Sequence, residues 1–97
     1  MACNRLLASQ GGNAGFPDYH KGFAVGRSFV APMDGWCYIS TNGRWVTFVD
    51  GAEVKQSTFN DDQVMGVLFP VSKGQYVHTE QEKYSGTFNF SVFYPCK

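Results

Sequence analysis

The C-terminal end of the chain constrains the fold most, because it reads as a strand that needs a core. Residues 87–95 (TFNFSVFYP) alternate between two sets of side chains that would fall on opposite faces of a strand. One set is Phe88, Phe90, Val92 and Tyr94, and the other is Asn89, Ser91 and Phe93. Period-two alternation of β-branched and aromatic residues is typical of a strand packed on a core. We therefore expect this segment to lie inside a sheet and not at a frayed end.

From Gly22 onward, the rest of the chain reads as short strands separated by turns. Strands are expected over 27–31, 35–41, 44–49, 64–69, 76–79 and 87–94. No stretch has a helical period, and Gly, Pro, Asn and Asp mark reversals at 32–35, 42–43 and 50–51. Eight or so short strands in 97 residues predict an all-β sandwich or barrel of antiparallel strands, without significant helix. Residues 1–20 are expected to form an irregular lead-in to a single sandwich domain over 21–97.

The Asn42-Gly43 pair is a strong local signal for a hairpin. A two-residue turn there would pair Ile39 with Val46 and Cys37 with Phe48, and these four apolar side chains would form one face. The opposite face is mixed and aromatic, and it holds Trp36, Tyr38, Ser40, Trp45, Thr47 and Val49. Such a face suits a partner or binding surface better than a dry core.

The next reversal, at Asp50-Gly51, can be closed in two ways. A two-residue loop would put Glu53 opposite Phe48 on the expected core face, and a three-residue loop over 50–52 would put Val54 there instead. A one-residue slip exchanges the two faces of a strand. We therefore predict the three-residue loop, with Gly51 in a left-handed conformation.

Composition argues against several classes of partner. Eight acidic and eight basic residues give a formal net charge of zero, whereas a nucleic-acid binder usually carries a basic patch. The first 15 residues lack the apolar core of a signal peptide, and no apolar run is as long as a membrane span. Aromatic residues make up 16% of the chain, and surplus rings often line subunit contacts or ligand surfaces. We expect neither nucleic-acid binding nor membrane insertion.

The cysteines do not suggest a disulfide framework or a metal site. Cys3, Cys37 and Cys96 are odd in number and widely spaced. We expect reduced thiols in a protein made in the cytoplasm. A Cys37–Cys96 bridge is the alternative, since both residues lie on expected strands.

The titratable residues give no catalytic or metal-binding motif. His20 follows Asp18 and His78 precedes Glu80, but neither pair has a third ligand nearby in the sequence. The acidic run at 60–62 is interpreted as a solvated loop, and a calcium site is the less favoured alternative. A carboxylate pair for glycoside hydrolysis could only arise in space, from Asp34, Asp50, Glu53, Glu80 and Glu82. The spacing does not favour such a pair, so we expect a protein that is not an enzyme and has no metal or cofactor.

Four segments, in order, resemble a known family. They are 29–38 (FVAPMDGWCY), 49–54 (VDGAEV), 67–77 (VLFPVSKGQYV) and 88–95 (FNFSVFYP). The ordered set, covering roughly residues 22–95, resembles the globular heads of the complement and tumour-necrosis-factor type. Phe90 stands where that family has a glycine. The lead-in at 16–19 and the short length look more like the compact heads at the C-termini of tailed-phage fibres.

The resemblance implies a jelly-roll sandwich that forms a homotrimer. In such trimers the terminal strands lie near the threefold axis, which would place the first side-chain set of the last strand in the subunit core. The side chains expected at the subunit interface are Trp36, Tyr38, Asn89, Ser91 and Phe93.

The resemblance also implies a virion protein, made in the cytoplasm of a host bacterium, that binds a cell-surface glycan or protein at the tip of a tail fibre or spike. The candidate receptor contacts are Asn42, Arg44, Trp45, Asn60, Asp61 and Asp62. Trp45 could instead pack beside Ser40 or against a neighbour, and Arg44 and the acids could form ordinary solvated turns. The alternative function is a structural trimer, in contact with other virion proteins, that decorates a capsid or plugs a tail without a receptor.

Overall fold

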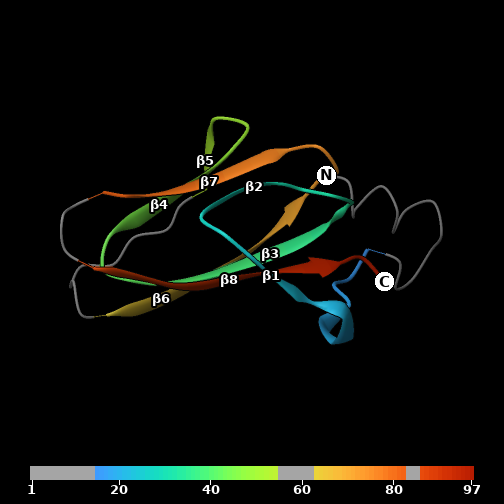
Figure 1. The fold of residues 1–97 in the computed structure, drawn as a ribbon, viewed down its shortest axis with the longest axis horizontal. Helices are drawn as coiled ribbons and strands as arrows, with labels where there is room; N and C mark the ends of the chain where they lie inside the picture. Colours follow the sequence, from blue (N-terminus) through green and yellow to red (C-terminus); the bar gives the residue numbers. More distant parts are fainter. Residues whose placement is uncertain (1–14, 55–62, 83–85) are drawn as a thin grey trace.

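A computed structural model describes residues 15–54, 63–82 and 86–97, and within them almost every element is a β-strand (Figure 1). One turn of 3₁₀ helix, η1 (Tyr19–Lys21), comes first. The strands are β1 (Phe23–Val25), β2 (Ser28–Val30), β3 (Gly35–Asn42), β4 (Trp45–Val49), β5 (Ala52–Val54), β6 (Val64–Val71), β7 (Tyr76–Gln81) and β8 (Thr87–Pro95). The predicted all-β antiparallel class is confirmed. In these described ranges, no helix has the length and apolar character needed to cross a bilayer.

The strands form two four-stranded antiparallel sheets that make the two layers of a sandwich (Figure 1). Sheet I has the order β1-β8-β3-β6, and sheet II has the order β2-β7-β4-β5. Of the connections between consecutive strands, only β4–β5 stays within one sheet; the others cross between sheets. Next to η1, residues 16–18 run beside the C-terminus: Asp18 N donates to Pro95 O (2.8 Å), and Lys97 N donates to Phe16 O (2.8 Å).

The core between the sheets combines apolar side chains with paired hydroxyl groups. Its buried apolar members are Ala31, Cys37, Ile39, Phe69, Val71, Val77 and Phe93. Thr47 and Thr79 are fully buried on neighbouring strands, and their Oγ1 atoms are 2.9 Å apart. Ser91 Oγ donates to Val25 O (2.7 Å). Every buried side-chain polar atom in the described ranges has a partner, so these hydroxyls avoid the penalty of unpaired burial.

Asn42-Gly43 is not a hairpin turn, which corrects the predicted pairing of residues 35–49. β3 pairs with β6 and β8 in sheet I, and β4 pairs with β5 and β7 in sheet II. The segment therefore carries the chain from one sheet to the other. Trp45 and Thr47 face the core from β4, and Val46 and Phe48 lie on the outside. An Asn-Gly pair permits positive φ in any tight reversal, so the local signal does not distinguish a hairpin from a crossing between sheets.

The β4–β5 reversal is a two-residue turn, so the predicted three-residue loop is wrong. Val49 pairs with Ala52, and Phe48 pairs with Glu53. Asp50 has φ 49° and Gly51 has φ 83°, the positive values that a type I′ turn requires; the left-handed Gly51 is thus confirmed. Because Phe48 faces outward, its partner Glu53 is exposed, and the register still keeps the carboxylate out of the core.

The terminal strand β8 lies inside sheet I, between β1 and β3, as expected. Its two faces are nevertheless exchanged from Phe90 onward. Ser40 pairs with Phe90 but Thr41 pairs with Phe88, so Asn89 is a bulge residue, and a bulge shifts the alternation by one position. Phe88 packs against the core as predicted. The later core-facing side chains are Ser91 and Phe93, only 1% and 0% exposed.

The cysteines differ from the expectation of three reduced thiols. Cys37 is free and buried, and burial raises the pKa of its thiol to about 12. Cys96 is disulfide-bonded. The expectation is therefore wrong for Cys96, and the alternative Cys37–Cys96 bridge is also wrong. Cys3 lies outside the described residues.

Candidate functional site

The outer face of sheet I carries no charged side chain among the strand residues described. Across the sheet, Ala24, Val92, Tyr38 and Leu68 form one register row. The rows on either side hold Tyr94, Trp36 and Pro70, and Phe90, Ser40 and Gly66. Leu68 is 41% exposed and Phe90 is 49% exposed. Contiguous apolar surface of this kind is typical of an interaction site.

Two tyrosines on this face lie directly over glycines. Tyr38 occupies the space in which a Cβ at residue 66 would lie, and Tyr94 occupies that space at Gly22, where the nearest ring atom would be 2.5 Å from the Cβ. The Tyr38 ring packs beside Phe90, with centroids 5.9 Å apart. The Tyr94 ring packs edge-on against Tyr19, at 5.0 Å. Because these rings lie close to the backbone, they protrude little from the face.

A shallow hollow lies between these rings. Its volume is about 290 Å³, and it is lined by Tyr19, Tyr38, Leu68 and Tyr94. Trp36 lies in the same sheet face, and its indole Nε1 donates to Gly15 O (2.9 Å). The hollow gives this face relief into which an apolar side chain of another molecule could fit.

The predicted interface residues separate into two groups. Trp36 and Tyr38 are half-buried on the outer face of sheet I, and Asn89 is exposed at the bulge. Asn89 Nδ2 donates to Asn42 Oδ1 (2.7 Å) and lies 3.3 Å from Ser40 Oγ. Ser91 and Phe93 are enclosed by their own sandwich, so placing them against a neighbouring subunit is wrong.

Sequence reasoning missed several residues of the outer face and of the hollow beside it, among them Tyr19, Leu68, Phe90, Val92 and Tyr94. The last three belong to the alternating set that was assigned to the core. The alternation was the correct signal, but a bulge cannot be read from it. Leu68 stands in an apolar run with no alternation to indicate its face.

The predicted receptor contacts do not form one exposed group. Trp45 is 3% exposed; its Nε1 donates to Asn42 O (3.0 Å), and the Arg27 guanidinium carbon lies 4.9 Å from its ring centroid. Trp45 therefore packs inside the sandwich and is not an exposed receptor contact. Asn42 and Arg44 are half-buried. The other candidates, Asn60, Asp61 and Asp62, lie outside the described residues.

The outer face of sheet II presents a different arrangement of rings and polar groups. Tyr76 is 46% exposed, and its ring is within 9° of parallel to the His78 ring, with centroids 6.1 Å apart. His78 Nδ1 lies 2.7 Å from Ser28 Oγ, and Nε2 lies 3.3 Å from Glu80 Oε2. A neutral imidazole satisfies both contacts if Nδ1 accepts from the Ser28 hydroxyl and Nε2–H donates to Glu80.

A serine, a histidine and a carboxylate in a hydrogen-bonded chain can serve nucleophilic catalysis. Here the chain lies on an open sheet face, with 36% of the His78 side chain and 52% of the Glu80 side chain exposed. Hydrolases of this type need donors for a developing oxyanion in a site that excludes water. The arrangement therefore fits a rigid polar surface better than a catalytic centre.

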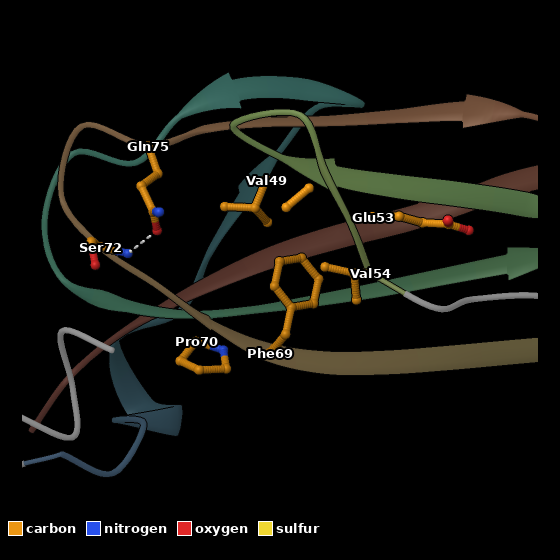
Figure 2. A pocket seen from close by; sticks show the side chains of 8 residues that line it. Val49, Glu53, Val54, Phe69, Pro70, Ser72 and Gln75 are labelled. Carbon is orange, nitrogen blue, oxygen red and sulfur yellow. Dashed lines mark hydrogen bonds between the residues drawn. The ribbon is translucent and has the colours of Figure 1, made fainter.

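A pocket of about 270 Å³ opens at the side of the sandwich between the edge strands β5 and β6 (Figure 2). Val49, Val54, Phe69 and Pro70 form its apolar wall. At one end, Ser72 N donates to Gln75 Oε1 (2.7 Å). Glu53 points away from the apolar wall in Figure 2. The pocket is thus a gap between sheet edges, and Glu53 is the one charged residue among the described residues that line it.

Three of the carboxylates named in the sequence analysis accept hydrogen bonds from backbone amides at turns or strand starts. Asp18 Oδ1 accepts from His20 N (3.1 Å) at the start of η1. Asp34 Oδ1 accepts from Lys73 N, and Asp50 Oδ1 accepts from Tyr76 N, both at 2.8 Å. Within the described part of the chain, no three His, Cys, Asp or Glu side chains are placed to hold a metal ion.

Comparison with known proteins adds no family to this picture, since neither a family model nor a curated protein matches the sequence.

Proposed function

We propose that this chain is a homotrimeric jelly-roll head of a bacteriophage virion, located at the tip of a tail fibre or spike, that binds the surface of a host bacterium without acting as an enzyme. The observation that carries the proposal is the uncharged, aromatic outer face of sheet I. The strand orders β1-β8-β3-β6 and β2-β7-β4-β5 support a jelly roll, because this fold divides eight antiparallel strands between two sheets.

The trimer explains the composition of sheet I. Its two central strands, β3 and β8, put Trp36, Tyr38, Val92 and Tyr94 near the middle of the outer face. The centre of a subunit interface is depleted in charge and enriched in aromatic residues. The formal net charge of zero adds no long-range repulsion between copies. Identical chains associate with closed symmetry, and a threefold arrangement would cover this face in every copy.

Host recognition would use the surfaces that the trimer leaves open. If sheet I faces the neighbouring subunits, the outer face of sheet II and the β3–β4 end with Asn42 and Arg44 face outward. Three weak sites on one rigid head gain strength from effective concentration, because the later contacts become intramolecular. The receptor is a glycan or protein of the host cell surface.

The burial of Trp45 favours a second candidate function. It removes the largest ring from the predicted receptor contacts. A structural trimer that decorates a capsid or plugs a tail would need the sheet I interface and no receptor site. Its partners would be other virion proteins.

Light scattering during size-exclusion chromatography tests the trimer, and binding to a panel of bacterial cells tests recognition. We expect a mass near three times 10.8 kDa, together with cell binding that weakens when Asn42 and Arg44 are replaced by alanine. A trimer that binds only assembled virions supports the structural alternative. A stable monomer contradicts both functions.

A further inference from the structure

The outer face of sheet II has an apolar part that is accessible in the single chain. Tyr76 and Val30 pair across β7 and β2 and are 46% and 59% exposed. Phe48 pairs with His78 on the other side and is half-buried. The near-parallel Tyr76 and His78 rings lie at the centre of this group. A ligand on this face would therefore meet ring surface and aliphatic surface together.

The polar part of the same face is held in place before any ligand arrives. His78 is fixed through both ring nitrogens, by Ser28 at 2.7 Å and by Glu80 at 3.3 Å. A fixed side chain loses little conformational entropy on binding. With the Ser28 proton directed to Nδ1, the remaining lone pairs of Ser28 Oγ and of the Glu80 carboxylate are acceptors. The face therefore favours a ligand that donates several hydrogen bonds.

The charged residues of this face limit which class of ligand it can bind. Glu80 and Glu53 are both exposed on this face, and Asp50 lies beside Tyr76. These carboxylates repel phosphates, sulfates and carboxylated sugars. Arg44 and Glu82 border one end of the face, where the Arg44 carbonyl oxygen accepts from Glu82 N, so that end has one residue of each charge sign. A ligand with apolar C–H faces, hydroxyl donors and no charge satisfies these conditions.

We infer that the outer face of sheet II binds a neutral saccharide, with a sugar ring on Tyr76 and sugar hydroxyls donating to Ser28 and Glu80. This inference rests on the proposed function, because it names the chemical class of the host receptor and its place on the head. The inferred sugar site lies at the centre of the outer face of sheet II, whereas the predicted receptor contacts Asn42 and Arg44 lie at the β3–β4 end. A single site would bind in the millimolar range, and three sites would give the head its avidity.

The test is a titration of ¹⁵N-labelled protein followed by NMR. The neutral probes are the methyl glycosides of glucose, galactose, mannose and N-acetylglucosamine, the anionic probe is the methyl glycoside of N-acetylneuraminic acid, and the cationic probe is N-acetyl-arginine amide. We expect at least one neutral probe to give saturable shifts at Ser28, Tyr76 and His78. The anionic probe should leave these resonances unmoved. If no neutral probe moves them, or if only the arginine amide does, the inference is overturned.

Four variants sharpen the result. Tyr76→Ala should weaken neutral-sugar binding roughly tenfold, a loss of about 1.4 kcal/mol, and Tyr76→Phe should retain binding and guard against a folding defect. Glu80→Gln keeps a carbonyl acceptor, so it should retain sugar binding but abolish any binding of the arginine amide. Phe16→Ala, which removes an exposed aromatic side chain beside the C-terminus, is the matched control and should bind as the parent does. Equal binding by Tyr76→Ala and the parent overturns the inference.

The same samples separate this inference from the proposed function. A trimer that binds host cells but no neutral sugar contradicts only the saccharide site. A monomer that binds a neutral sugar at Tyr76 contradicts only the trimeric head.

Discussion

The Tyr38 side chain extends over Gly66 on the outer face of sheet I, and its hydroxyl end occupies the space that any larger residue at position 66 would need. The tyrosine comes from β3 and the glycine from β6, and the ring also packs beside Phe90 of β8. One side chain thus spans three neighbouring strands of the sheet. The arrangement gives the charge-free face its low profile, and it makes Gly66 a sensitive position.

Replacing Gly66 by alanine should destabilise the domain, because the added methyl group displaces the Tyr38 ring. We expect a loss of about 1–3 kcal/mol in the free energy of unfolding, measured by denaturant titration. Gly26→Ala is the matched control, since the nearest atom to a new Cβ there is 3.9 Å away. The control should change stability by less than about 1 kcal/mol. Equal stability of the two variants would show that the ring does not rest on residue 66.

A charge on the outer face of sheet I should break the assembly without unfolding the chain. Phe90 is 49% exposed in the single chain, so Phe90→Glu should fold, but it would bury a carboxylate in the proposed interface. Light scattering should then give a mass near 10.8 kDa instead of three times that value. Val30→Glu, an exposed apolar position on sheet II, should leave the mass of the parent. Trimeric Phe90→Glu would exclude this face from the subunit interface.

The buried thiol of Cys37 should make stability depend on alkaline pH. Burial raises the pKa of Cys37 from 9.0 to about 12, so the folded protein keeps a proton that the unfolded chain loses. The stabilising contribution is therefore complete below about pH 9 and is lost as the pH rises towards 12. The free energy of unfolding should fall by up to about 1.4 kcal/mol per pH unit in this range.

Denaturant titrations of the parent and of Cys37→Ala at several alkaline pH values measure this effect. The variant should be less stable at neutral pH because of the cavity, and it should show a shallower decline. The difference between the two pH curves isolates the effect of the Cys37 thiol from that of other groups that titrate in the same pH range. Parallel pH curves for the two proteins would contradict the raised pKa. A thiol reagent should modify Cys37 only after denaturation.

The Thr47–Thr79 hydroxyl pair should behave as a unit. Their Oγ1 atoms are 2.9 Å apart in the core, and Thr47→Val would leave the Thr79 hydroxyl without this partner. We expect a cost of about 1–3 kcal/mol. Thr79→Val should lower the free energy of unfolding less in the Thr47→Val background than in the parent, with a coupling energy of about 1 kcal/mol. Strict additivity in the four-protein cycle would show that the pair does not contribute to stability.

The positions of the strands could be predicted from local sequence, but their partners could not. Alternation and turn residues located β3, β4, β7 and β8 to within two residues at each end. The pairing of β3 with β6 and β8 depends on contacts between distant segments. The Asn42-Gly43 turn had the right conformational freedom for a hairpin, yet the two flanking strands belong to different sheets.

As with the fold, the parts of the candidate sites that could be predicted are those that depend on residues close together in the sequence. Alternation along residues 35–41 separated Trp36 and Tyr38 from the core residues Cys37 and Ile39, and the structure confirms this separation. Alternation could not find Ser28, which lies 50 residues from His78 in the sequence. The faces of β8 were exchanged because the bulge at Asn89 adds one residue to the strand, and no composition signal marks it.

The position of β8 between β1 and β3 has a consequence for how the chain folds on the ribosome. Sheet I cannot be completed until residues 87–95 have left the exit tunnel, since β1 has no described sheet neighbour other than β8. Until then, β1 and β3 each have an apolar face and an edge that β8 has not yet paired with, a condition that promotes aggregation. With one hairpin among the described connections, few local contacts are available to start folding, and such topologies fold slowly. Truncation within β8 should therefore yield insoluble chains and not a smaller stable domain.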